Sequence, residues 1–206
     1  MNDSLSYLNG DYQALADAKI SVLDRGFIFG DGVYEVVPVY ARRLFRFEQH
    51  MQRLTRSLGK VGMGNPLTAE QWLAMCRKLV ADHAANDQVV YIQVTRGVAR
   101  RDHVFPKNVA QTVFAMTNPL PHLSAEVRER GVACISTNDF RWTKGDIKST
   151  SLLAAVLARQ MSADVDAIET IMFRDGFLTE ASASNVWIAS AGKLIAPLKE
   201  IGRAHV

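Results

Sequence analysis

The sequence has little cysteine, no long apolar run and no dominant sign of charge. Its two cysteines, Cys76 and Cys134, lack the spacing of a metal site, and each lies in an apolar stretch, which predicts reduced core thiols. No apolar run approaches the roughly 20 residues of a membrane span, and the first residues lack the basic and then apolar order of a secretory signal. We therefore expect a cytoplasmic protein without membrane contact.

The charged residues give no reason to propose a nucleic-acid partner. The formal net charge is +3, and the 24 Lys and Arg residues are spread along the chain instead of clustering. With 206 residues and 48% hydrophobic content, the chain can bury the core of one large domain or of two domains of about 100 residues each. This composition favours a soluble protein that binds small molecules.

The first half of the chain alternates strand and helix patterns. Asn9-Gly10 is a turn signal between two short predicted strands. Apolar residues recur at intervals of three and four after Phe47, which predicts an amphipathic helix, and Thr68 with Gln71 has the spacing of a capping box before a second helix. Further strands are predicted for residues 33–40, 88–97 and 111–119.

Two prolines lie close together near residue 120, where the pattern loses its period. We therefore predict an N-terminal α/β domain at 1–119, a linker at 120–125 and a second domain at 126–199. The second domain is expected to contain a strand near 132–137 and a hairpin that turns at 174–176. Between them, one helix face is predicted from its apolar residues: Leu152, Leu153, Val156, Leu157 and Met161.

Lys148 precedes this helix or lies in its first turn. The positive end of a helix dipole disfavours a charged lysine and lowers its pKa, so Lys148 is a candidate nucleophile. On position alone, a solvated surface lysine is the commoner case. The neighbouring sequence favours the nucleophile.

Three stretches carry a resemblance to a known family. "DIKSTSLLAAVLARQ", at 146–160, resembles the lysine segment of the fold-type IV pyridoxal-phosphate enzymes, also called class IV aminotransferases. "LTEASASNVW", at 178–187, resembles their second signature, and "DRGFIFGDGVYEVV", at 24–37, resembles their N-terminal one. The three occur in the family's order, and the resemblance covers about residues 24 to 197.

The resemblance implies an α+β fold of two domains and a set of residues that bind pyridoxal 5'-phosphate. Lys148 would be catalytic and would hold the cofactor as a Schiff base, while Glu180 would pair with its pyridinium nitrogen. Arg53 would neutralise the phosphate, and Ser182 and Ser184 would offer hydroxyls to a phosphate or to a substrate carboxylate. No metal is implied. Glu35 has no role that the sequence explains.

The closest subgroup in this resemblance is the D-amino-acid aminotransferases, which convert D-alanine and a 2-oxo acid to pyruvate and a D-amino acid. The resemblance implies that Tyr34 faces the substrate and that Arg101 and His103 trap its carboxylate. Ser151 stands where this subgroup usually has asparagine, and Ala183 where a hydroxyl is common. A homodimer that acts on small amino acids and 2-oxo acids is expected.

Other functions stay open on the sequence. Two lie in the same family, a branched-chain L-amino-acid aminotransferase and an aminodeoxychorismate lyase, and the third is a catalytically inert fragment. Members of the family extend well beyond residue 206, so the second domain is expected to be incomplete. Residues 200–206, "EIGRAHV", resemble a translated sequencing adapter, which predicts a non-native tail.

Overall fold

The computed structural model describes residues 4–197, which form two compact units. The first unit consists of residues 4–121 together with Lys148–Ser151, and the second of residues 122–147 and 152–197. Both units combine helices with sheets, so the predicted α+β class is confirmed. The predicted tail at 200–206 lies outside the described residues.

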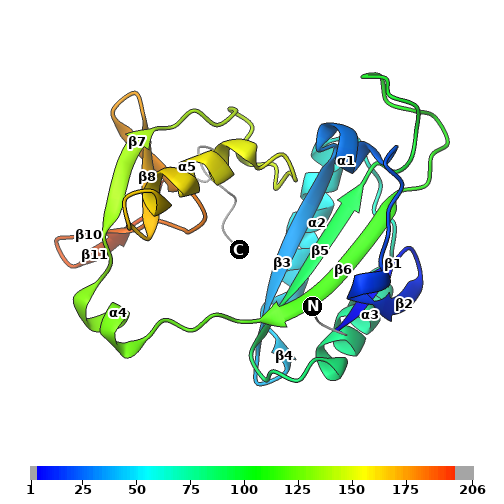
Figure 1. Ribbon diagram of the computed structural model, residues 1–206, viewed down its shortest axis with the longest axis horizontal. Helices are drawn as coiled ribbons and strands as arrows, with labels where there is room; N and C mark the ends of the chain where they lie inside the picture. Colours follow the sequence, from blue (N-terminus) through cyan, green and yellow to red (C-terminus); the bar gives the residue numbers. More distant parts are fainter. Residues whose placement is uncertain (1–3, 198–206) are drawn as a thin grey trace. The chain divides into compact units, whose positions relative to one another are not determined.

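A six-stranded antiparallel sheet forms the frame of the first unit (Figure 1). Its order is β2-β1-β6-β5-β3-β4. Asn9 and Gly10 both have positive φ, 53° and 108°, as the predicted two-residue turn between β1 and β2 requires. The strands are β1 (Leu5–Leu8), β2 (Asp11–Ala14), β3 (Gly32–Tyr40), β4 (Arg43–Leu44), β5 (Gln88–Thr95) and β6 (Thr112–Pro119).

Two helices, α2 (Phe47–Lys60) and α3 (Ala69–Asp82), cover one face of this sheet (Figure 1). The predicted capping box at the start of α3 is confirmed, because the Thr68 side chain accepts from the Gln71 amide while the Gln71 side chain accepts from the Thr68 amide. A short helix, α1 (Arg25–Phe29), and a 3-10 turn at Leu15–Asp17 precede β3. The core between helices and sheet contains large, fully buried side chains: Leu54, Leu58, Trp72, Leu79, Val37 and Ile92.

The second unit contains a three-stranded sheet in the order β7-β8-β9 and a separate hairpin. The parallel strands β7 (Cys134–Asn138) and β8 (Glu169–Arg174) are joined by α5 (Leu153–Ala163), as a parallel pair requires a crossover. Asp175 and Gly176, with φ of 52° and 80°, form the predicted turn into β9 (Phe177–Ala181). The remaining elements are α4 (Ala125–Arg130), β10 (Ile188–Ser190) and β11 (Lys193–Ile195).

The predicted helix is confirmed as α5, whereas the prediction that Cys134 is a core thiol is wrong. The apolar face of α5 is exposed, from 40% at Met161 to 72% at Leu153, and the helix is buried instead through the small residues Ala155, Ala158 and Ser162. Small side chains let the helix approach β8 closely, where the Thr170 hydroxyl donates to the Ala158 carbonyl at 2.6 Å. Cys134 is exposed because β7 is an edge strand, whereas Cys76 is buried in α3.

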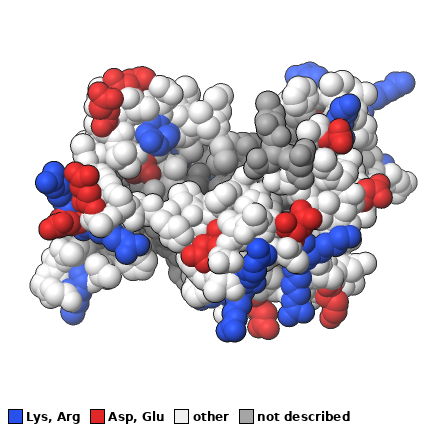
Figure 2. Space-filling model, turned by 60° about the horizontal axis from the view of Figure 1, so that its bottom comes forward, with Lys and Arg blue, Asp and Glu red and all other residues white. Residues whose placement is uncertain are grey.

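Neither helices nor surface charge point to a membrane or a polyanion. Within residues 4–197, no helix combines the length and the apolar character that crossing a membrane requires. On the face that Figure 2 presents, Lys and Arg are interspersed with Asp and Glu. This agrees with the even spread of charge along the sequence.

Gly97 is a position where the fold of the first unit depends on the absence of a side chain. Its φ is +96°, and a Cβ there would lie 1.9 Å from the Ala110 carbonyl oxygen. We expect Gly97→Ala to lower the free energy of unfolding by at least about 2 kcal/mol, measured by urea denaturation. Gly64→Ala is the control, because a Cβ at Gly64 meets nothing within 4 Å. Equal stability of the two variants would contradict this account of Gly97.

Candidate active site

Lys148 is held by backbone pairing with the start of β3. Strand β4 pairs only with Val39 and Tyr40, so the same edge of β3 is open at its beginning. The Tyr34 amide donates to the Lys148 carbonyl at 2.9 Å, and the Thr150 amide donates to the Gly32 carbonyl at 3.0 Å. The segment therefore belongs to the first unit, although the chain on both sides of it belongs to the second.

Lys148 precedes a helix, which is the first of the two predicted alternatives, and does not lie in the first turn of that helix. Helix α5 begins at Leu153, and its N-cap is Leu152. The polar backbone groups of the lysine segment are engaged by β3, so the segment is extended and does not join the helix. Proximity to a helix N-terminus is therefore not what sets the chemistry of Lys148.

The structure brings Lys148 and Tyr34 together. The Lys148 Nζ lies 3.9 Å from the centroid of the Tyr34 ring, within the range of a cation–π contact. Tyr34 is buried, and its ring stacks on Tyr91 with centroids 5.8 Å apart. Burial, with the neighbouring Tyr34, raises the pKa of Tyr91 to about 12, so this ring stays neutral at physiological pH. The lysine amine is thus positioned by an uncharged aromatic wall.

The departure at Ser151 has a structural role. The Ser151 hydroxyl donates to the Gly30 carbonyl at 3.1 Å, and the Thr150 hydroxyl donates to the same carbonyl at 3.0 Å. Both contacts tie the lysine segment to the chain just after α1. A serine at 151 therefore helps to hold Lys148 in place.

Glu35 forms a buried cluster with His50 and Arg53 between β3 and α2. The Glu35 carboxylate is fully buried, lies 3.0 Å from the His50 Nδ1, and accepts from the Arg53 Nε at 2.8 Å and from its Nη2. Burial alone would raise the pKa of Glu35, but the hydrogen bonds from Arg53 and His50 outweigh it and hold the pKa below its ordinary value. The positive charge of Lys148 acts in the same direction. Arg53 is thus fixed by a buried anion.

His50 and the role of Glu35 are absent from the sequence prediction. A signal for both was present in the pattern. Glu35 falls on the buried side of a strand whose other inward residues are valines, and His50 and Arg53 are three residues apart on the adjoining helix. A buried acid beside such a pair indicates an ion-pair cluster.

Glu180 lies on β9 in the second unit and is held by Arg141, a residue that the sequence analysis did not single out. The Glu180 carboxylate forms a buried ion pair with the Arg141 Nη1. Arg141 also donates to Asp139 at 2.9 Å, and Arg174 lies 3.1 Å from the same aspartate. Burial lowers the pKa of Arg141, but Asp139 and Glu180 outweigh this effect and raise the pKa above its ordinary value.

Ser182 and Ser184 follow Glu180 in a segment organised by Glu169. The Ser182 hydroxyl donates to the Glu169 Oε1, and the Ser182 amide donates to the same oxygen at 3.1 Å. Burial raises the pKa of Glu169, but hydrogen bonds from Ser182 and Ser184 outweigh it, so the net shift is downward. Ser182 is buried and Ser184 is exposed. Their binding of a phosphate or carboxylate stays a prediction.

Arg101 and His103 lie together on an exposed loop of the first unit. Their side chains flank Phe29 at the end of α1, with the guanidinium carbon and the imidazole centroid 5.4 Å and 5.3 Å from the ring centroid. Arg25 donates to the Asp102 carbonyl and holds the loop against α1. Both side chains of the pair contact the Phe29 ring.

Residues 32–203 match the model of the amino-transferase class IV family. The chain belongs to this family. Over 191 residues it is 38% identical to the D-alanine aminotransferase of Staphylococcus aureus strain MSSA476, and over 181 residues it is 35% identical to that of Bacillus licheniformis. The aligned parts cover 90% and 88% of this chain but only 66% and 64% of those enzymes.

Solved structures share the fold. The branched-chain amino acid aminotransferase of Escherichia coli superimposes with a TM-score of 0.88 at 19% identity, covering 97% of this chain and 69% of that one. A fold IV transaminase from Curtobacterium pusillum superimposes with a TM-score of 0.81 at 19% identity, covering 94% and 69%. The fold-type IV architecture is therefore confirmed.

Class IV aminotransferases depend on pyridoxal phosphate, and the side chains of this chain fit that cofactor. A phosphate needs a cation, and Arg53 is a guanidinium fixed by the buried Glu35. A pyridinium nitrogen needs a carboxylate, and Glu180 is one that is buried and ion-paired. An aldehyde needs an amine, and Lys148 has its amine beside the Tyr34 ring.

The buried Glu35 cluster gives the stability of the protein a dependence on pH. The pKa of Glu35 lies below 4.5 in the folded state, so its ion pairs stabilise the protein above pH 4.5 and are lost as the pH falls through the folded pKa. We expect Glu35→Gln to cost about 2 kcal/mol or more at pH 7, because it leaves Arg53 without its buried anion. The difference from the unmodified chain should shrink below pH 4.5 in urea denaturation.

Glu48→Gln is the matched control, because Glu48 is exposed in the first turn of α2. Its cost should stay at or below about 1 kcal/mol at every pH. A difference for Glu35→Gln that stays constant from pH 7 to pH 3 would show that Glu35 is not an ionised partner of Arg53.

Proposed function

We propose that the protein is a pyridoxal-phosphate D-amino-acid aminotransferase that converts D-alanine and a 2-oxo acid to pyruvate and a D-amino acid. The observation that carries this proposal is the position of Lys148, held by β3 with its amine over the buried Tyr34 ring. The relatives named D-alanine aminotransferase support the choice of substrate.

Lys148 is the catalytic residue of the proposal. When bound, the cofactor supplies an electron sink for the electron pair left at the substrate α-carbon. Lys148 would hold the cofactor through its amine and, when that amine is free, would carry the substrate α-proton. Pairing with β3 confines the lysine backbone, so only the side chain has to move.

Two charged residues hold opposite ends of the cofactor in this proposal. The Glu180 carboxylate would hold the protonated ring nitrogen, and its ion pair with Arg141 orients it. Arg53 donates to the phosphate, with Glu35 and His50 holding its guanidinium. Ser182 and Ser184 are proposed as further donors to the phosphate or to the substrate carboxylate.

Tyr34, Arg101 and His103 are proposed to bind the substrate. A guanidinium offers a bidentate fork to a carboxylate, while a histidine and a tyrosine hydroxyl add single donors. Which face of the substrate α-carbon meets Lys148 depends on where its carboxylate is held. The selectivity for the D-enantiomer therefore arises from these three side chains.

A homodimer is part of the proposal. The first unit exposes large apolar side chains on α1, on the loop before it and on the loop between β5 and β6: Val22, Leu23, Phe27, Val98 and Val104. Phe27 and Val104 are 69% and 73% exposed, and a contiguous exposed apolar patch is typical of an interaction surface. Light scattering should give twice the mass of one chain, and a monomer at micromolar concentration would reject the dimer.

A branched-chain L-amino-acid aminotransferase is the second candidate. Its support is the likeness to the Escherichia coli enzyme, which at 19% identity concerns the fold alone. The D-alanine aminotransferases are about twice as similar in sequence, at 35% to 38%. The D-amino-acid reading is therefore preferred.

Absorbance spectra of the purified chain with pyridoxal phosphate test the cofactor lysine and the stereochemistry together. We expect a visible band that is lost in Lys148→Ala, retained in the exposed control Lys144→Ala, and converted by D-alanine but not by L-alanine or L-leucine. Conversion by L-leucine alone would favour the second candidate. A band that survives in Lys148→Ala would reject the lysine, and no band in any variant would identify the chain as an inert fragment.

Arg101 can be tested as the residue that binds the substrate carboxylate. We expect Arg101→Gln to raise the KM for D-alanine by about 10- to 100-fold, because a charge-assisted bidentate contact is lost. Arg100→Gln removes an exposed charge from the neighbouring position and should leave KM within about twofold. An unchanged KM in Arg101→Gln, or an equal rise in Arg100→Gln, would reject the assignment.

A further inference from the structure

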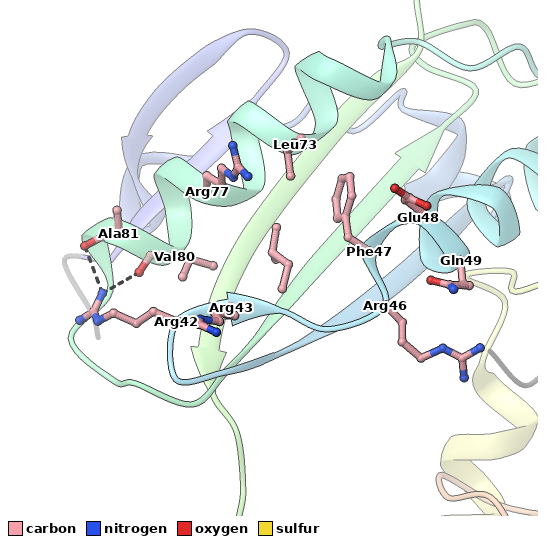
Figure 3. Close-up of a pocket in the computed structure, with 11 residues that line it drawn as sticks. Arg42, Arg43, Arg46, Phe47, Glu48, Gln49, Leu73, Arg77, Val80 and Ala81 are labelled. Atoms are coloured by element: carbon pink, nitrogen blue, oxygen red, sulfur yellow. Dashed lines mark hydrogen bonds between the residues drawn. The ribbon is translucent and has the colours of Figure 1, made fainter.

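A cavity lies in the first unit, between the β3–β4 hairpin, the start of α2 and the last turns of α3 (Figure 3). Its volume is about 700 Å³, within the range of small-molecule sites. None of the residues that line it has a role in the proposed transamination. They are Arg42, Arg43, Leu44, Arg46, Phe47, Glu48, Gln49, Leu73, Arg77, Val80 and Ala81.

Arg42 makes the walls of this cavity rigid. Its guanidinium donates to the Val80 carbonyl at 3.0 Å and to the Ala81 carbonyl at 3.4 Å (Figure 3). It also donates to the His83 carbonyl at 3.0 Å, where the end of α3 leaves carbonyls without helical partners. The hairpin is thereby fastened to α3. One wall of the cavity is therefore hydrogen-bonded to the other.

Arg43 and Arg77 give the cavity two available cations. Arg77 extends from α3 and Arg43 from β4, on separate walls (Figure 3). Both are exposed, and neither forms an ion pair within the part of the chain that the structure describes. Glu48 is the one carboxylate among the lining residues. Arg46 extends away from the other labelled side chains and is given no part in binding the ligand (Figure 3).

The walls between these cations are apolar. Phe47, Leu73 and Val80 line the same space, and Phe47 contributes an aromatic ring at the start of α2 (Figure 3). An inorganic anion would leave this apolar surface in contact with water, and an uncharged apolar ligand would leave the guanidinium groups without partners. The lining therefore selects for a ligand that has both a charged and an apolar part.

We propose that this cavity binds an aromatic phosphate monoester of about the size of a nucleoside monophosphate. The phosphate, with about two negative charges and three acceptor oxygens, is placed at Arg43 and Arg77, because a guanidinium matches phosphate oxygens in a bidentate manner. The ring lies against Phe47, Leu73 and Val80. Nucleotides and the cofactor itself share this chemistry, so the experiment must separate the two sources.

Adenosine 5'-monophosphate is the probe for the test. It is titrated into the isotope-labelled chain, with and without saturating pyridoxal phosphate, and binding is followed by the NMR shifts of backbone amides. The expected shifts are confined to residues 42–49 and 73–81 and appear in both samples, with adenosine and inorganic phosphate each binding at least about tenfold more weakly. Loss of the shifts in the presence of pyridoxal phosphate, with pyridoxal phosphate moving the same amides, would assign the site to the cofactor instead of a nucleotide.

Three variants separate a built site from general attraction to positive charge. Arg43→Gln with Arg77→Gln should weaken binding about tenfold or more, whereas Arg56→Gln, an exposed arginine further along α2, should leave it unchanged. Lys148→Ala should also bind the probe normally, so this inference can fail independently of the proposed transamination. Shifts near Arg53 alone, equal binding of adenosine, or an equal loss in Arg56→Gln would overturn the proposal.

Discussion

The backbone pairing between Lys148–Ser151 and the beginning of β3 is the constraint on which the candidate site depends. The pairing uses the part of β3 with which β4 does not pair, and it places Lys148 beside Tyr34. Because side chains alternate along a strand, Tyr34 lies on one side of β3 and Glu35 on the other. One strand therefore positions the lysine amine, its aromatic neighbour and the anion that fixes Arg53.

Both units use the same device to hold a charged group in place. In the first unit the fully buried Glu35 fixes Arg53, and in the second unit Arg141 fixes the buried Glu180. Buried ion pairs cost desolvation and contribute little net stability when both partners are present. In this protein the ion pairs hold the charged side chains in a fixed orientation, and preorganised charges bind a cofactor at a lower entropic cost. Removing either partner should therefore disturb both stability and binding.

Local chemistry predicted local structure well. The Asn9-Gly10 and Asp175-Gly176 turns and the Thr68 capping box follow from residues within four positions of one another. The missed features are long-range. The edge of β3 that pairs with the Lys148 segment is more than 110 residues away in sequence. Arg141, which forms the ion pair with Glu180, is 39 residues before it. Spacing along a chain cannot reveal these contacts, and the functional prediction came from the resemblance of three signatures.

Hydrogen exchange at the Tyr34 and Thr150 amides tests the central claim most directly. Both amides donate across the pairing of the lysine segment with β3, at 2.9 Å and 3.0 Å. We expect them to exchange at least about 100-fold more slowly than the amides of the exposed loop that carries Arg101 and His103. Exchange of Tyr34 and Thr150 at the rate of that loop would show that β3 does not hold Lys148.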